Sequence, residues 1–246
     1  MELKTPVLFL AISLLAIVLF YLASGRKRWV LTGSFIWLTV IGLLAYFRVF
    51  IDTSIPPRIL IVILTAFILG IFTYRKLELS TMSLPFLMAI HGLRLPVEIV
   101  LLQLYHQGLV PEVMTFQGWN FDIFIGITGL LWLLFHGRIN ILNHPMLLLI
   151  WNVLGFCMLT IIVLLAILTS PLPFQVLAFD QPNRAVLQFP YTFLPAFIVP
   201  LVYLAHILEI NRLTKYFLAN TFLEKKSLFG GVTSSKLNIT DNSSFE

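Results

Sequence analysis

Residues 82–104 read MSLPFLMAIHGLRLPVEIVLLQL, an apolar stretch that carries His91, Arg94 and Glu98. About 20 apolar residues are needed to cross the hydrocarbon core of a bilayer, so the stretch is long enough to span a membrane. A charged side chain at the centre of a bilayer costs roughly 2.5–3.5 kcal/mol on insertion scales, and such residues normally face a partner, a cavity or a substrate. The stretch therefore predicts a membrane span with a polar site inside it.

The composition of the whole chain is that of a membrane protein. Of its 246 residues 59% are hydrophobic and only 11% are charged, with a mean hydropathy of +0.96, whereas about a quarter of the residues of a soluble domain are charged. The sequence predicts an all-α, polytopic transmembrane helix bundle of about seven spans. The spans are expected at Thr5 to Ala23, Trp29 to Phe50, Arg58 to Thr73, Met82 to Leu104, Phe121 to Phe135, Pro145 to Thr169, and Gln188 to Ile210.

Lysine and arginine gather on alternate connections, and cytoplasmic connections retain positive charge. This bias predicts an N-out, C-in orientation in a bacterial inner membrane, and it explains the net charge of +5 without a nucleic-acid partner. The inner connections and tail would hold Arg26, Lys27, Arg28, Arg75, Lys76, Arg138, Arg212, Lys215, Lys225, Lys226 and Lys236; the outer ones would hold Asp52 with Arg58, Glu112 with Asp122, and Asp180 with Arg184.

The chain divides into two predicted parts. Residues 1–210 form the seven-helix transmembrane domain, and residues 211–246 form a cytoplasmic tail. The end of that tail is rich in Gly, Ser and Asn and has no apolar period, so the tail is expected to be largely disordered.

One face of the fourth span carries nearly all of its polarity. At about 100° per residue, His91, Arg94, Glu98, Tyr105 and His106 fall on one side of a helix. Pro96 is expected to kink the helix beside the charged pair. Two interpretations stay open. Arg94 and Glu98 pair with each other or with other helices and only hold the bundle together, or Arg94 binds an anionic group while Glu98 or His91 exchanges protons.

The rest of the candidate site is expected on the outer side of the membrane, where the two longest connections lie. Arg94 carries five donors that Glu98 alone cannot satisfy, so further acceptors are expected from Asp122, Asn152, Tyr46 or freed carbonyl groups near Pro96. The predicted pocket opens outward. The candidate ligand-binding residues are His91, Arg94, Glu98, Tyr105, His106, Asn120, Asp122, Asp180, Asn183 and Arg184.

No sequence signature identifies a reaction. The single cysteine, Cys157, cannot form an intrachain disulfide, and neither a metal site nor a cofactor is predicted. His206 and Glu209 are expected to form a local structural pair, which leaves His91 as the only histidine clearly in the core. A haem held by two histidines is therefore not expected.

Three functions are compatible with these features. The first is a membrane protein that binds or modifies an amphiphilic molecule such as a lipid, an isoprenoid or a quinone. The second is a proton-coupled transporter in which Glu98, His91 and Asp122 relay charge. The third is a non-catalytic subunit or assembly factor with a membrane protein partner. Membrane lipid is an expected partner in each case.

Overall fold

The computed structural model describes residues 4–236 of the chain, and the side chains of residues 4–220. Six helical segments are long and apolar enough to cross a membrane, and α6 is a shorter apolar helix. This confirms the predicted all-α bundle of about seven spans. The helices are α1 (Lys4–Ala23), α2 (Arg28–Tyr46), α3 (Arg58–Lys76), α4 (Leu84–Gly92), α5 (Arg94–His106), α6 (Asp122–Phe135), α7 (Pro145–Thr169) and α8 (Val199–Lys236), with short turns η1 (Leu79–Thr81), η2 (Glu112–Met114), η3 (Asn140–Asn143) and η4 (Ala185–Leu187), and a π-helical turn, η5 (Leu194–Ile198).

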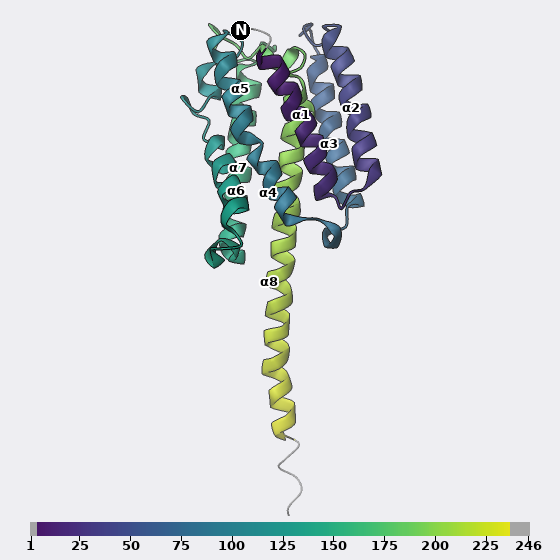
Figure 1. Ribbon diagram of the computed structural model, residues 1–246, viewed down its shortest axis with the longest axis vertical. Helices are drawn as coiled ribbons and strands as arrows, with labels where there is room; N and C mark the ends of the chain where they lie inside the picture. Colours follow the sequence, from purple (N-terminus) through teal and green to yellow (C-terminus); the bar gives the residue numbers. More distant parts are fainter. Residues whose placement is uncertain (1–3, 237–246) are drawn as a thin grey trace, which may run out of the picture.

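The helices are arranged around α8. In Figure 1, α1, α2 and α3 lie on one side of α8 and α5, α6 and α7 lie on the other. The helix α4 packs against α1, α6 and α8, and α7 runs along α8. The connections at residues 24–27, 77–83 and 136–144 lie at one end of the bundle, here called the basic end, and the N-terminus lies at the opposite end.

Large apolar side chains cover the outside of the bundle. Ile36, Leu64 and Leu134 have 66%, 63% and 70% of their surface exposed. Such a surface would drive association in water, whereas in a bilayer it faces lipid. Helices also satisfy their own backbone hydrogen bonds, as a membrane interior requires.

The fourth span is broken at Leu93, between α4 and α5. Pro96 has no backbone N–H to donate to the carbonyl of Gly92, four residues earlier, and its ring crowds that carbonyl. The break was expected beside the charged pair, and it makes Arg94 the first residue of α5.

The last span differs from the prediction at both ends. It was expected to begin at Gln188, but residues 188–193 form a turn and a short irregular segment, and the helical segment starts at Leu194. The two prolines, Pro190 and Pro195, explain the late start. The sequence predicted a largely disordered tail over residues 211–246. The structure describes α8 as continuing to Lys236 (Figure 1). Residues 237–246 lie outside the described part of the chain, so disorder of the tail stays a prediction. Residues 211–226 contain three leucines and three lysines, and these residues favour a helix.

Candidate functional site

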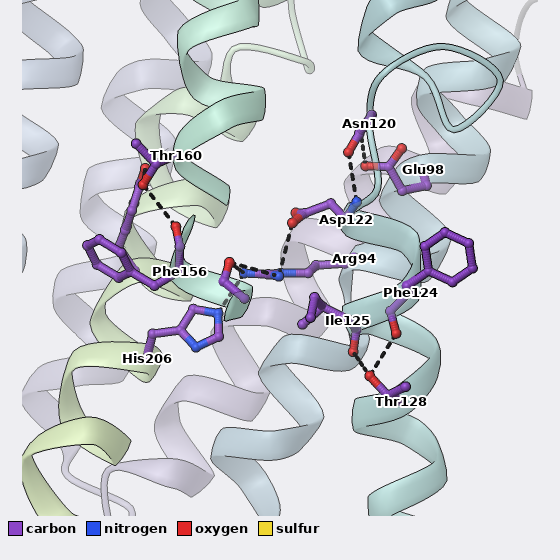
Figure 2. A network of polar contacts seen from close by, with 12 residues as sticks. Arg94, Glu98, Asn120, Asp122, Phe124, Ile125, Thr128, Phe156, Thr160 and His206 are labelled. Carbon is purple, nitrogen blue, oxygen red and sulfur yellow. Dashed lines mark hydrogen bonds and ion pairs between the residues drawn. The ribbon is translucent and has the colours of Figure 1, made fainter. Parts of the chain in front are cut away.

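Arg94 lies at the point where α5, α6, α7 and α8 meet. Only 4% of its surface is exposed. Its Nη1 donates a hydrogen bond to Oδ1 of Asp122 over 3.0 Å, and its Nη2 approaches Nε2 of His206 to 2.8 Å and the carbonyl oxygen of Gly155 to 3.4 Å (Figure 2). Arg94 was expected to reach Asp122, and this contact is present. The side chain therefore ties four helices together.

The hydrogen bonds around His206 determine where its proton lies. Asn152 donates from Nδ2 to the carbonyl of Leu148 over 3.0 Å, which directs its Oδ1 toward Nδ1 of His206 at 2.8 Å. Because an amide oxygen only accepts, Nδ1 of His206 must carry the proton. Nε2 is then free to accept from Arg94, and the imidazole is neutral in this arrangement.

A second buried pair joins His91 of α4 to Glu209 of α8. Nε2 of His91 lies 3.3 Å from Oε2 of Glu209, and neither side chain is exposed. The ring of His91 also lies against that of His206, with 4.1 Å between their centroids. The expected local pair of His206 with Glu209 is therefore wrong, as is the expectation that His91 is the only core histidine. Helical spacing shows which residues share a face, and it does not show what lies across from that face.

Glu98, one turn after Arg94, has a different partner. Asn120 donates from Nδ2 to Oε1 of Glu98 over 2.6 Å and accepts the backbone N–H of Asp122 on its Oδ1 over 3.0 Å (Figure 2). The other carboxyl oxygen of Glu98, Oε2, is buried and has no hydrogen-bond partner among the described residues. Pairing of Arg94 and Glu98 with each other or with other helices was one of the two interpretations. Here Arg94 pairs with Asp122 of α6, and Glu98 bonds to Asn120 just before α6.

Charged groups do not balance within this cluster. It holds one cation that keeps its proton, Arg94, and three buried carboxyl groups, those of Glu98, Asp122 and Glu209. An unpaired buried charge costs several kcal/mol, so two of the three carboxyl groups need a bound proton or another cation. His91 can serve Glu209 in this way when it is protonated. The cluster is thus suited to taking up and releasing protons.

A cavity of about 100 Å³ adjoins Glu98, and we call it the Glu98 cavity. A cavity of about 150 Å³ holds benzene in another protein, so a short hydrocarbon segment fits a space of this order. Glu98, Asp122 and Ser170 are its polar residues. The apolar lining comes from α3, α5, α7 and the start of the last span, including Ile63, Phe67, Val97, Leu101, Leu159, Ile162, Val163 and Leu194. The helices α3 and α7, which both line the cavity, make little direct contact with each other.

Several candidate residues lie away from this cluster. Tyr105 is partly exposed and bonds to Glu112 over 3.3 Å, and His106, Asp180 and Arg184 are exposed. Asn183 is buried, but its amide faces Ser170 and the carbonyl of Ala166 at 3.5 Å.

Tyr46 was expected as an acceptor for Arg94. It is 69% exposed and packs against Phe47 and Phe189, so this expectation is wrong.

The sequence analysis missed His206, Glu209 and the carbonyl of Gly155 as parts of the cluster. His206 and Glu209 carry the same signal that identified Arg94, an ionisable side chain within an apolar span. No sequence signal identifies a backbone carbonyl. Among the side chains of residues 4–220, no three His, Cys, Asp or Glu side chains are placed to hold a metal ion together.

Comparison of the chain with protein-family models, with curated proteins and with solved structures finds no match in any of the three. The functional argument therefore depends on the geometry of the cluster and of the cavity beside it.

Proposed function

We propose that this integral membrane protein binds an amphiphilic molecule of the lipid, isoprenoid or quinone class in the Glu98 cavity. The observation that carries the proposal is the unpartnered Oε2 of Glu98, a buried polar atom in the wall of a mainly apolar cavity. A buried polar group without a partner costs about 1–3 kcal/mol, and a ligand that supplies the partner recovers this energy. The protein would lie in a bacterial inner membrane with its N-terminus outside.

The chemistry of the cavity restricts the polar end of the ligand. Arg94 is already paired with Asp122, so among the side chains of residues 4–220 no free cation lines the cavity to bind a phosphate. The two carboxyl groups in its lining would repel one. A hydroxyl or amine can donate to Glu98 when the carboxyl is ionised, and a carbonyl can accept from it when it is protonated. The hydrocarbon part would occupy the apolar lining and extend between α3 and α7.

Replacement of Glu98 tests the proposal. Glu98→Gln removes the carboxyl group and keeps the size of the side chain. The amide oxygen of glutamine can still accept the hydrogen bond from Asn120. We expect about a tenfold loss of the co-purified amphiphile, because hydrogen bonds to charged groups contribute about 1.5–3 kcal/mol. The measurement is native mass spectrometry of protein purified in mild detergent, with the released molecule identified by fragmentation.

Two further variants make this experiment decisive. Val163→Phe fills the cavity from α7 and should also release the amphiphile. Glu78→Gln changes an exposed acid at the basic end and should leave the bound amount unchanged. An unaltered amount of ligand in both Glu98→Gln and Val163→Phe would refute binding in this cavity.

The charge imbalance supports a second candidate, proton-coupled transport. Titratable groups extend from Glu98 at the cavity to Glu209 of α8, by way of Asp122, His206 and His91. Uptake into proteoliposomes that requires a pH gradient and is abolished by Glu98→Gln would favour transport over binding alone. A membrane protein that co-purifies stably would instead favour the role of a subunit or assembly factor.

A further inference from the structure

A second cavity lies between α1, α2, α3 and the last span, in the half of the bundle nearer the basic end. Its volume is about 200 Å³, and we call it the Gly33–Gly70 cavity. Nearly all of its lining is apolar or aromatic, and Ser34 and Thr73 are its only hydroxyl side chains. The Gly33–Gly70 cavity and the Glu98 cavity share no lining residue, although both use residues near the start of the last span. The two cavities are therefore separate sites.

Two glycines, Gly33 and Gly70, line this cavity. A Cβ atom added at Gly33 of α2 or at Gly70 of α3 would meet no other atom within 4 Å. The two helices make little direct contact with each other, and each packs against the last span. Residues of the last span such as Ala196 and Leu204 line the cavity between α2 and α3. In a bilayer, the gap between these two helices would face the hydrocarbon.

Positive charge surrounds the end of the crevice at the basic end. Nζ of Lys76 lies 4.7 Å from the centre of a Trp29 ring, and Trp29 lines the cavity. Arg28 and Arg75 are exposed at the same ends of α2 and α3. Tryptophan settles at the depth of the lipid headgroups, and clusters of Lys and Arg beside a membrane span attract anionic lipid.

We propose that the Gly33–Gly70 cavity binds an acyl chain of an anionic phospholipid from the leaflet at the basic end, with the phosphate beside Lys76 and Arg28. The cavity has the shape and apolar lining for a hydrocarbon chain, and the cations lie where the headgroup of that chain would be. The proposal is independent of the Glu98 cavity, which is lined by carboxyl groups and offers no free cation.

Phosphatidylglycerol and phosphatidylcholine with identical acyl chains are the probes. The purified protein is exchanged into each lipid, and the retained lipid is counted by native mass spectrometry. The wild-type protein is expected to retain phosphatidylglycerol in preference to phosphatidylcholine. Gly33→Leu and Gly70→Leu should each lower retention of phosphatidylglycerol about tenfold, because the added side chain displaces two or more methylene groups of the lipid.

Matched variants separate the chain from the headgroup. Gly137→Leu places the same side chain at an exposed glycine with no atom within 4 Å, outside the cavity, and should retain the lipid. Lys76→Gln should weaken the preference between the two lipids, because one of the cations at the headgroup is lost. Glu98→Gln should leave retention of phosphatidylglycerol unchanged, so failure of this proposal is distinguishable from failure of the proposed function.

Photo-crosslinking of the wild-type protein covers the case in which a leucine variant does not fold. A phosphatidylglycerol with a photoreactive acyl chain should label peptides that contain residues 29–37 or 66–73. Labelling confined to segments that do not line the cavity would overturn the proposal. Wild-type retention of phosphatidylglycerol in folded Gly33→Leu and Gly70→Leu would also overturn it, and equal retention of the two lipids by the wild-type protein would overturn the role of the cations.

Discussion

Arg94 and Asp122 form a buried ion pair at the meeting point of α5, α6, α7 and α8, and Arg94 is permanently charged. The pair avoids a loss of stability only while both partners are present. Removing one partner of a buried pair leaves an uncompensated charge, which costs about 3–5 kcal/mol, whereas replacing both by apolar residues is often neutral.

We therefore expect opposite outcomes for single and double replacement. Arg94→Met should lower the free energy of unfolding by about 3–5 kcal/mol, because Asp122 loses its counter-charge. Arg94→Met combined with Asp122→Leu should recover at least half of that loss. Equilibrium unfolding in detergent micelles measures both. A double variant that is as unstable as the sum of the two singles would show that the pair has no mutual dependence.

The same residues show what sequence could and could not predict about the site. Arg94, Glu98 and Asp122 were identifiable because a charge in an apolar stretch is costly and so must have a partner. The partners of His206 and Glu209 were not, because a single sequence contains no information on which faces of distant helices meet. The roles of the candidate residues in ligand binding stay predictions.

The helix α6 illustrates how small residues set the position of a whole element. It has 14 residues and packs closely on α4 and α5. A Cβ at Gly126 would lie 2.8 Å from the backbone nitrogen of Leu95, which cannot move aside, whereas a Cβ at Gly129 would lie 3.5 Å from Cβ of His91. The first distance is too short for a real contact, and the second is ordinary packing.

Alanine at these two glycines should thus have different effects. Gly126→Ala should destabilise the protein by about 1–3 kcal/mol, since α6 must move away from α5 and carry Asp122 with it. Gly129→Ala should be neutral or stabilise by up to about 1 kcal/mol, because alanine favours a helix over glycine. Thermal unfolding of the two variants gives the comparison. Equal losses of stability would contradict the close approach at Gly126.

Apolar runs of the right length predicted the existence of the helices. They predicted the residues at which the helices begin and end less accurately. The break at Leu93 was expected from Pro96, because proline acts through its own backbone. The late start of the last span was missed, since Pro190 and Pro195 lie in an apolar run that hydropathy alone continues to Gln188. The continuation of α8 past residue 211 depends on helix propensity, which the sequence analysis did not weigh for the tail.

The Glu98 cavity and the Gly33–Gly70 cavity lie at different depths in the molecule. The Glu98 cavity lies toward the end that holds the N-terminus, and the Gly33–Gly70 cavity lies toward the basic end. The orientation of the bundle therefore decides from which leaflet each cavity takes its ligand. Positive charge on cytoplasmic connections predicts that the basic end faces the cytoplasm.

Cysteine labelling tests this orientation. In a background with Cys157→Ala, single replacements Lys27→Cys and Gly137→Cys sit at the basic end, and Gln117→Cys sits at an exposed position of the opposite end. Gln117 serves better than its neighbour Gly118, where a Cβ would lie 2.4 Å from the carbonyl oxygen of Glu112. A maleimide that cannot cross membranes should label only position 117 in intact spheroplasts, and all three positions after permeabilisation. Labelling of positions 27 and 137 alone would reverse the orientation, so that the anionic phospholipid of the Gly33–Gly70 cavity would come from the outer leaflet and Glu98 would face the cytoplasmic half.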